Sequence, residues 1–553
     1  MQSSIEARIA DRLRFLYGNA DALDALKTII SRRPIAPRGG SLTERDAVLI
    51  AYADHVRQPD AAPLETLRRF AVDSLRDAVS AIHILPFYPF TSDDGFSVSD
   101  YRAVNPDFGD WDMIRRIGAD FRLMFDVVLN HASVSSAWFQ AFLRGEPPFD
   151  EYFVTASPDD DLSMVVRPRT HPLLTPFETA TGTRYVWTTF STDQADLNFA
   201  NPAVLLEMID ILLFYIQQGA DLIRLDAIAF LWKTPGTVSI HLPQTHAVVK
   251  LMRDVLDAAA PWVTLITETN VPHVENLSYF GSGTDEAQMV YQFALPPLLL
   301  HTFYTGDALT LSEWAATLET PSDRTTFFNF TASHDGIGIR PASGLISDAA
   351  IQSMLDTVLA RGGRISYKAN PDSTQSAYEM NITYFDALAI PGEPLETSVD
   401  RFLASQSIML ALAGVPGIYL PSLFGGANWQ AGVEKTGRAR TINREKYDLD
   451  VLQSQLNDSR GRYGCVFNRY RELLGIRRSQ PAFHPNSPQR VLDLHPAVFA
   501  LERGSLLALH SVSEKPVDVA LPSGSWRDLI GGEAYQASAS LRPYQVLWLV
   551  QEG

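Results

Sequence analysis

The segment Asp221-Leu222-Ile223-Arg224-Leu225-Asp226-Ala227 indicates the fold. An apolar run that ends in Arg-x-Asp is typical of a buried strand with charged last residues, and an unpaired buried charge costs several kcal/mol. Residues i and i+2 of a strand point to the same face, so we expect Arg224 and Asp226 to lie side by side. The guanidinium would keep the Asp226 carboxylate ionised and oriented, as a nucleophile requires. Taken alone, the segment fits a structural ion pair equally well.

Similar short apolar runs recur along the chain, and most of them end in polar residues. With the first segment they make eight candidate strands, namely Val48–Ala53, Ala81–Leu85, Leu123–Leu129, Leu222–Leu225, Val263–Ile266, Met289–Leu295, Phe327–Ala332 and Gly414–Leu420. Helix-like segments such as Ala203–Gln217 and Thr245–Ala259 lie between them. This alternation predicts an α/β fold, a (β/α)8 barrel, in which functional groups stand at the carboxyl ends of the strands.

Two intervals are too long for simple barrel connections, and they follow the third and seventh candidate strands. We expect a small inserted domain in the first and a loop-rich lid in the second. The chain ends in short alternating runs that predict an antiparallel β domain. The expected parts are a helical extension (1–45), barrel segments (46–131, 197–335 and 392–483), the inserted domain (132–196), the lid (336–391) and the C-terminal β domain (484–553).

The composition excludes several classes of function. A net charge of −18 argues against nucleic acid and anionic membranes as partners, so an anionic substrate would need a local cluster of Arg or Lys. The single cysteine, Cys465, fits a reducing compartment. The N-terminal residues lack the apolar core of a signal peptide, and no segment has the length of a membrane span. We therefore expect a cytoplasmic protein with small-molecule partners, either a monomer or a homodimer.

Three acidic residues stand at separate strand ends: Asp226, Glu268 and Asp335. Retaining glycoside chemistry needs one carboxylate as nucleophile and a second carboxyl group as acid and then base, roughly 5–5.5 Å apart. Asp226 suits the nucleophile, and Glu268 suits the acid/base if burial raises its pKa. Asp335 would hold sugar hydroxyls and stabilise the transition state. Each residue singly is as compatible with a structural or helix-capping role, but the set favours catalysis.

The chain resembles glycoside hydrolase family 13, the α-amylase family, through four short motifs in order. They are Asp126-Val127-Val128-Leu129-Asn130-His131, Ile223-Arg224-Leu225-Asp226, Thr267-Glu268 and Ser333-His334-Asp335. The resemblance assigns the three carboxyl groups the roles given above and adds His131, Arg224 and His334 to the glucose subsite. It implies no metal, although Asn130 and nearby carboxylates resemble positions where some α-amylases hold calcium.

Further motifs narrow the resemblance to the sucrose phosphorylase subfamily. They include Leu85-Pro86-Phe87-Tyr88-Pro89-Phe90, Asp93-Asp94-Gly95-Phe96, Arg167-Pro168-Arg169, His334-Asp335-Gly336-Ile337-Gly338 and Arg440-Thr441-Ile442-Asn443-Arg444. The resemblance implies transfer of glucose from an α-glucoside to phosphate with retention, and no cofactor besides phosphate as co-substrate. It also implies the glucose-binding residues, which are Asp93 and Arg440 at the far hydroxyls, Phe96 and Phe190 as an aromatic wall, and Gln194 close by.

Phosphorolysis brings a dianion to a site that already holds carboxylates, so a cation is needed on the acceptor side. The motif match favours Arg169, with Tyr378 as a hydroxyl donor. Lys233 and Arg167 are weaker candidates.

Two departures from the subfamily bear on the acceptor. The lid carries Ser376-Ala377-Tyr378-Glu379 where sucrose phosphorylases tend to have Asp-Leu-Tyr-Gln, and Phe230 stands where they have a tyrosine. The lid and the run from Thr267 to His273 resemble the glucosylglycerate phosphorylase branch, whose acceptor is D-glycerate. Glucosylglycerol, sucrose and sucrose 6′-phosphate are competing donors. Glu379 fits an anionic acceptor only if it binds a hydroxyl or is neutralised by a cation. A hydrolase or transglucosidase, or a non-catalytic barrel, is a more distant alternative.

Overall fold

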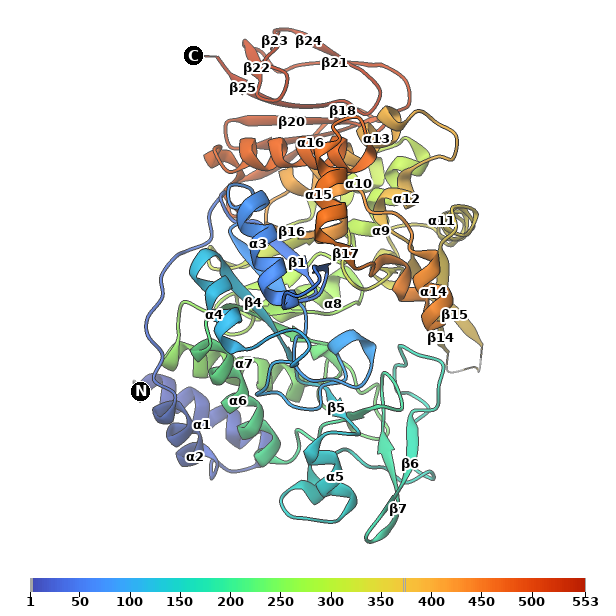
Figure 1. Cartoon of the computed structure of the whole chain (residues 1–553). Coiled ribbons are helices and arrows are strands. Elements are labelled where there is room, and N and C mark those ends of the chain that lie inside the picture. The colour runs from blue at the N-terminus through green and yellow to red at the C-terminus, as the bar shows by residue number, and fades with distance from the viewer. Residues whose placement is uncertain (1–2, 371, 373, 553) are drawn as a thin grey trace.

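The computed structural model describes residues 3–370, 372 and 374–552, and its centre is a closed barrel of eight parallel strands (Figure 1). In chain order these are β1 (Val48–Ala51), β3 (Ala81–Ile84), β4 (Arg122–Val128), β9 (Ala220–Asp226), β10 (Thr264–Thr267), β11 (Met289–Tyr291), β12 (Thr326–Phe330) and β16 (Val415–Tyr419). The predicted barrel is confirmed, with each strand in its expected segment. The largest difference in length is in the run expected over 289–295, where the strand ends at Tyr291 and Leu295 already begins a helix that Pro296 and Pro297 favour in its first turn.

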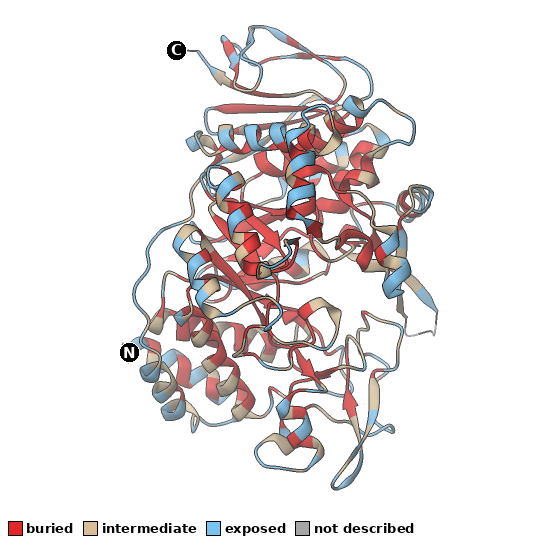
Figure 2. Ribbon diagram, in the orientation of Figure 1, coloured by how far each residue is buried: buried red, intermediate tan, exposed pale blue. Residues whose placement is uncertain are grey.

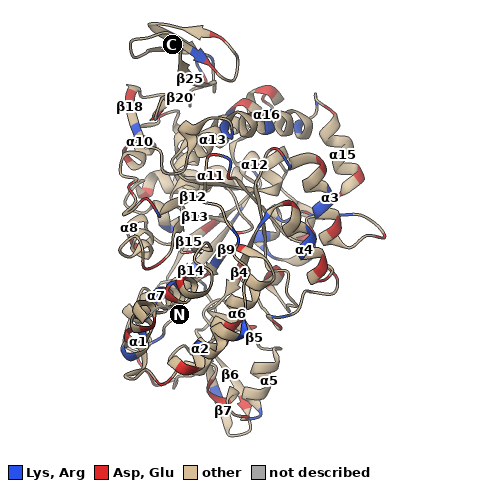
Figure 3. Ribbon diagram, turned by 90° about the vertical axis from the view of Figure 1, so that its left-hand side faces the viewer, with Lys and Arg blue, Asp and Glu red and all other residues tan. Residues whose placement is uncertain are grey.

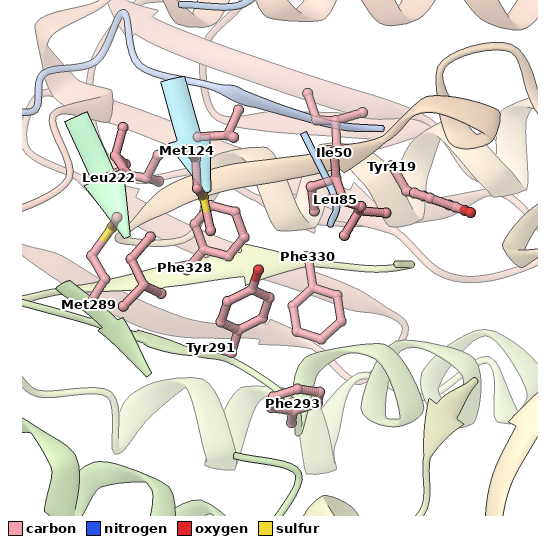
Figure 4. Close-up of a cluster of buried hydrophobic side chains, with 14 of the residues drawn as sticks. Ile50, Leu85, Met124, Leu222, Met289, Tyr291, Phe293, Phe328, Phe330 and Tyr419 are labelled. Atoms are coloured by element: carbon pink, nitrogen blue, oxygen red, sulfur yellow. The ribbon is translucent and has the colours of Figure 1, made fainter. Parts of the chain in front are cut away.

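Apolar side chains from several strands fill the barrel interior (Figure 4). Leu222 of β9 meets side chains such as Met124 of β4 and Phe328 of β12 there, and all three are buried. Because side chains alternate along a strand, the inward position of Leu222 places Arg224 and Asp226 on the same inner face, nearer the carboxyl end of β9. The sequence therefore positions these two charged groups at one mouth of the barrel.

Helices cover the outside of the barrel, with their buried faces towards the strands (Figure 2). The main ones are α3 (Pro63–Leu75), α4 (Trp111–Asp120), α6 (Pro202–Gln217), α7 (Pro243–Ala259), α9 (Leu295–Thr305), α10 (Leu309–Ala316), α13 (Leu395–Ala411) and α16 (Arg462–Arg477). The N-terminal extension forms α1 (Ser3–Tyr17) and α2 (Leu23–Arg32), which pack on α7 and α6. An ion pair between Arg33 and Asp210 (2.7 Å) ties α2 to α6.

The interval after β4 holds a small set of elements beside the barrel mouth. Its strand β5 (His131–Ser133) pairs antiparallel with β8 (Gln194–Asp196), and α5 (Ala137–Leu143) and the hairpin of β6 (Leu174–Thr179) and β7 (Gly182–Trp187) lie between them in sequence. This pairing returns the chain to the barrel mouth, so Gln194 comes to lie near His131.

The interval after β12 is more regular than the loop-rich lid that we expected. It contains a three-stranded antiparallel sheet of β13 (Ile337–Gly338), β15 (Gln375–Asn381) and β14 (Arg364–Ala369), and helices α11 (Asp348–Ala360) and α12 (Tyr384–Leu388). None of the six residues of β14 is buried, although Ile365, Tyr367 and Ala369 alternate with polar residues, a strand pattern that the expectation of a loop-rich lid overlooked. Pro371 and Ser373 of this segment lie outside the described residues. The Ala369 amide donates to the Arg169 carbonyl (3.2 Å), which joins the two insertions.

The C-terminal part is an antiparallel β domain, as predicted. Its six-stranded sheet has the order β18 (Gln489–His495), β19 (Val498–Arg503), β20 (Leu506–Ser511), β25 (Val546–Gln551), β22 (Trp526–Asp528) and β23 (Ala534–Tyr535), and β21 (Val517–Ala520) pairs with β24 (Ser538–Leu541). A cavity of about 470 Å³ lies where this domain meets α13 and α16, far in sequence from the charged strand ends. Across the described residues, no helix is long and apolar enough to cross a membrane.

Candidate active site

The three predicted carboxyl groups meet at one mouth of the barrel. Asp226 ends β9, Glu268 follows β10, and Asp335 lies in the loop after β12. The parallel register of β9 and β10 pairs Arg224 with Ile266, which brings Glu268 beside Asp226. They line one small chamber, here called the inner chamber, together with further residues. Its lining comprises Asp93, Phe96, His131, Arg169, Phe190, Gln194, Asp226, Ala227, Glu268, Asn270, His334, Asp335, Tyr378, Glu379 and Arg440.

Arg224 holds Asp226 in place, as the strand pattern predicts. Its Nη1 donates to Asp226 Oδ1 (2.7 Å) and also to Asp126 Oδ1, and its Nη2 lies 3.9 Å from Glu268 Oε2. Asp126 is itself fixed by His83, whose Nε2 lies 2.6 Å from Oδ2. Burial would raise the pKa of Asp126, but Arg224 and His83 override it and hold this pKa at about 2. The buried guanidinium is therefore shared between a permanent anion and the candidate nucleophile.

Burial raises the pKa of both Asp226 and Glu268, and Arg224 opposes this in each case. The expectation that Arg224 alone would keep the pKa of Asp226 low is wrong, because burial and the neighbouring carboxylates outweigh it. The two side chains are only 7% and 9% exposed, so little solvent screens the repulsion between their charges. Arg224 lies 2.7 Å from Asp226 and 3.9 Å from Glu268, so its positive charge favours ionisation of Asp226 more than that of Glu268. Glu268 also accepts a hydrogen bond from the Ala227 amide (2.9 Å).

Asp335 is held as an anion by the groups around it. Burial would raise its pKa, but Arg440, His334 and Arg444 together lower it below the usual range for a carboxyl. Arg440 Nη1 lies 2.7 Å from Asp335 Oδ1. The same guanidinium forms a two-point ion pair with Glu379, a buried residue of β15. Glu379 is therefore neutralised by a cation, one of the two conditions under which it fits an anionic acceptor.

Aromatic and imidazole rings make the deep wall of the inner chamber. The Phe96 ring stacks on His334, with ring centroids 4.6 Å apart and an interplanar angle of 7°. His131 Nε2 lies 2.9 Å from the Phe96 carbonyl oxygen and 3.0 Å from Gln194 Nε2. Burial lowers the pKa of both histidines, that of His334 to about 3, so both rings are neutral hydrogen-bonding groups. This wall has the flat apolar face and polar rim that a sugar ring requires.

A strained turn places Phe96 and Asp93 at the chamber. Asp93 and Asp94 have φ values of 53° and 49°, and Gly95 has φ 115°. A side chain at Gly95 would collide with the carbonyl oxygen of Pro86. Arg444 anchors the turn through Asp94, with Nη1 2.5 Å from Oδ2. The residues of the motif Asp93–Phe96 are thus needed for the conformation of the turn as well as for contacts with a ligand.

Arg169 also lines the inner chamber, where it lies beside two further aromatic rings. Its guanidinium carbon lies 5.6 Å from the centre of the Phe190 ring and 5.5 Å from that of Tyr378. Its Nη1 donates to the Pro168 carbonyl (3.0 Å), and among the described residues no carboxylate lies within 4 Å of it. Arg169 is thus a cation held by rings and left open to a ligand.

A second, wider chamber of about 320 Å³ opens outward from the first, and we call it the outer chamber. The two chambers share Asp93, Arg169, Phe190, Gln194, Glu379 and Arg440. The outer chamber alone is lined by Ser92, Ser191, Ser366, Tyr367, Arg438, Ala439 and Arg444. A substrate whose sugar fills the inner chamber would therefore place its other half in the outer one.

Comparisons with known proteins agree with this geometry. Residues 75–337 match the family model described as the α-amylase catalytic domain. The chain is 48% identical over 550 residues to the glucosylglycerate phosphorylase of Allomeiothermus silvanus, covering 98% of each chain. The chain belongs to the α-amylase family. The glucosylglycerate phosphorylase of Escherichia coli K12 is 42% identical, with 99% of this chain and all of that one covered. These relatives place the chain among the glycoside phosphorylases of glycoside hydrolase family 13.

A solved structure gives the same fold. The sucrose 6F-phosphate phosphorylase of Thermoanaerobacter thermosaccharolyticum superposes with a TM-score of 0.75 at 23% identity, over 91% of this chain and 99% of that one. The chain therefore shares its overall architecture with that solved structure.

Three predicted acceptor-side residues lie elsewhere in this α-amylase family member. Phe230 lines neither chamber, because its ring packs edge-on against Phe190, with centroids 5.5 Å apart. Arg167 donates to the His171 carbonyl and also lies outside both chambers. The third is Lys233, which is fully paired within the protein.

Lys233 occupies the position near Asn130 that resembled a calcium site. Its Nζ donates to Asn130 Oδ1 (2.6 Å) and lies 2.9 Å from Asp196 Oδ2. The ammonium thus satisfies the oxygens that a cation would bind. Among the described residues, no group of three or more His, Cys, Asp or Glu side chains is arranged to hold a metal ion.

The sequence reasoning missed several residues that shape the site. Asp126 begins the first family motif, but the sequence analysis gave it no role. It lies opposite Arg224 on the neighbouring strand β4, and a buried acid in a predicted strand could have pointed to it. Asn270 lines the inner chamber, and Arg438 and Arg444 line the outer one. Arg444 is the last residue of the motif Arg440–Arg444, whereas nothing in the sequence distinguishes Arg438 from any exposed arginine.

Proposed function

We propose that the chain is a retaining α-glucosyl phosphorylase that converts 2-O-α-D-glucosyl-D-glycerate and phosphate to α-D-glucose 1-phosphate and D-glycerate. The observation that carries the proposal is Arg169, which has no carboxylate partner within the described structure and lies at the boundary of two chambers, one of which holds Asp226 and Glu268. A hydrolase has no need of such a cation, because water is neutral. Relatives of nearly the same length named glucosylglycerate phosphorylase support glycerate as the acceptor.

In the first step, Asp226 attacks the anomeric carbon of the bound glucose and forms a covalent β-glucosyl ester. Glu268 donates its proton to the departing O2 of glycerate, so the bond between that oxygen and the anomeric carbon breaks as the ester forms. Burial raises the pKa of Glu268, which favours the protonated form that this step requires. Arg224 aligns the attacking carboxylate through its 2.7 Å contact with Oδ1.

In the second step, a phosphate oxygen attacks the anomeric carbon from the side that glycerate has left. The ester bond to Asp226 breaks, its electron pair returns to the carboxylate, and Glu268 takes up any proton that the phosphate oxygen carries. Two inversions give net retention, so the product is α-glucose 1-phosphate. Arg169 and the Tyr378 hydroxyl would hold the dianion against the repulsion of the carboxylates.

The remaining residues of the inner chamber have supporting roles in this proposal. Asp335, held as an anion, would bind sugar hydroxyls and stabilise the positive charge that develops on the sugar ring. Asp93 and Arg440 would hold the hydroxyls far from the reacting bond. Phosphate enters as co-substrate, and the proposal assigns no resident cofactor or metal. We infer a cytoplasmic location, which the single cysteine supports.

The test is the release of α-glucose 1-phosphate by the purified protein from four donors, each with phosphate and without it. The donors are glucosylglycerate, glucosylglycerol, sucrose and sucrose 6′-phosphate. The proposal predicts fast phosphate-dependent release from glucosylglycerate. A preference for another donor would keep the mechanism and overturn the acceptor, whereas free glucose released without need of phosphate would overturn the phosphorylase assignment.

A further inference from the structure

The outer chamber carries a local excess of positive charge. Among the described residues, its charged lining consists of Arg169, Arg438, Arg440, Arg444, Asp93 and Glu379. The chain as a whole has a net charge of −18, and Figure 3 shows acidic and basic residues interspersed over its outside. Four arginines against two acids therefore set this chamber apart, as expected for a pocket that receives anions.

Two of these arginines are already neutralised by the protein. Arg440 binds Glu379 at two points and Asp335 at a third. Arg444 Nη1 lies 2.5 Å from Asp94 Oδ2, and its Nε donates to a backbone carbonyl (2.8 Å). The charge of each of these two guanidinium groups is already balanced by a carboxylate, which leaves the charge excess on Arg169 and Arg438.

Arg438 differs from Arg169 in its position and its freedom. It lines only the outer chamber, whereas Arg169 lines both. Within the described part of the chain, the Arg438 side chain makes no hydrogen bond or ion pair, but its backbone is fixed. Its amide donates to Thr436 Oγ1 (3.2 Å), and its carbonyl accepts from the Thr441 amide (3.2 Å). A fixed backbone with a free guanidinium at a cavity wall is suited to bind a ligand group.

We propose that Arg438 binds the carboxylate of D-glycerate and thereby selects an anionic acceptor over an uncharged one. The inference rests on the proposed function. Phosphate and glycerate alternate beside the anomeric carbon, but glycerate is the longer molecule, and its carboxyl group is attached to the carbon that bears the reacting oxygen. Arg169, at the boundary of the chambers, serves the phosphate. Arg438, further out, meets the carboxylate, and the ion pair of Glu379 with Arg440 removes the repulsion that this carboxylate would otherwise meet.

The test uses full-length protein in the synthetic direction, with α-glucose 1-phosphate as donor and either D-glycerate or glycerol as acceptor. For Arg438→Ala we expect the ratio of kcat/KM for glycerate to that for glycerol to fall by about 10-fold or more, mainly through KM for glycerate. Arg438→Lys should restore part of the ratio, because it keeps the charge. The matched control is Arg460→Ala, another exposed arginine without a side-chain partner in the described structure, which should leave the ratio as in the wild type.

A second measurement separates the carboxylate from phosphate. Arsenate-dependent hydrolysis of α-glucose 1-phosphate uses the phosphate position without glycerate, and we expect Arg438→Ala to lose far less of this rate than of glycerate transfer. An equal loss in arsenolysis, or an equal loss with glycerate and glycerol, would overturn the inference. If the wild type uses glycerate well, a KM for glycerate that is the same in Arg438→Ala as in the wild type would also overturn the inference. A wild type that transfers to glycerol or fructose but not to glycerate would overturn the proposed function as well.

Discussion

Arg440 and Glu379 form a two-point ion pair, with Nε 3.0 Å from Oε2 and Nη2 2.5 Å from Oε1. The remaining amino group of Arg440 lies 2.7 Å from Asp335 Oδ1. Glu379 therefore positions the guanidinium that holds Asp335. Its negative charge is used within the protein, which makes an acidic lid residue compatible with anionic substrates.

Replacement of Glu379 by alanine should weaken both stability and catalysis. The change leaves the largely buried Arg440 with one carboxylate partner, so we expect the free energy of unfolding to fall by roughly 3 kcal/mol, seen as a lower Tm. The value of kcat/KM should fall for every glucoside donor, because Arg440 is no longer held in position to pair with Asp335. Glu379→Gln keeps the shape and one hydrogen-bond acceptor, so its losses should be smaller. Wild-type activity in Glu379→Ala would contradict the positioning role.

Removal of Arg169 should cost phosphate-dependent chemistry most. A hydrogen-bonded contact to a charged group is worth about 1.5–3 kcal/mol, so Arg169→Ala should reduce kcat/KM for phosphate by roughly 10- to 100-fold. Slow hydrolysis of the glucosyl-enzyme by water should persist, because water needs no cation. Arg167→Ala, in the same loop but outside both chambers, is the matched control. Equal losses of phosphorolysis and hydrolysis in Arg169→Ala would show that the residue does not act on phosphate.

The pH dependence of kcat/KM should have two limbs set by the coupled carboxyl pair. Burial raises the pKa of Glu268, and the reaction needs its protonated form, so the rate should fall as the pH rises through this pKa. The pKa of Asp226 is raised as well, and attack needs its ionised form, so the rate should fall as the pH drops through that value. With α-glucosyl fluoride, whose leaving group needs no proton, Glu268→Gln should lose the alkaline limb. Retention of that limb would assign it to another group.

The buried pair of Lys233 and Asp196 should stabilise the inserted domain at the barrel mouth. Lys233→Met keeps the length of the side chain but leaves the fully buried Asp196 carboxylate without its cation, which should cost roughly 3 kcal/mol of stability. Thermal unfolding measures the loss. The double variant Lys233→Met with Asp196→Asn removes both charges and should recover part of the Tm. A single variant as stable as the wild type would contradict the importance of the pair.

The sequence was sufficient to predict the barrel and the residues around its mouth. Parallel strands buried on both faces give continuous apolar runs, and each run ends where functional groups stand. Asp226, Glu268 and Asp335 could be found in this way, because their signal is local: a charged residue directly after a buried segment. Residues such as His131 and Arg440 depended on the family motifs.

Ion pairs between residues far apart in the chain could not be predicted from the sequence. The partner of Glu379 is 61 residues away, and Lys233 meets Asn130 and Asp196 from a different loop. No periodicity links such residues, so the sequence left Lys233 as a candidate cation for phosphate and gave no partner for Glu379. The strand β14 was missed for a different reason: Ile365, Tyr367 and Ala369 alternate with polar residues, but the run is short and none of it is buried, so it was included in the expected lid. These ion pairs and this strand are stabilised by tertiary contacts, which form only in the folded chain.

The most direct test of the central claim is to trap the covalent intermediate and offer it phosphate. Glu268→Gln, incubated with α-glucosyl fluoride, should accumulate one glucosyl group on the peptide that contains Asp226, as measured by mass spectrometry. Addition of phosphate should release that group as α-glucose 1-phosphate faster than water releases glucose. An adduct on another residue, or a glucosyl-enzyme that phosphate does not discharge, would contradict the account.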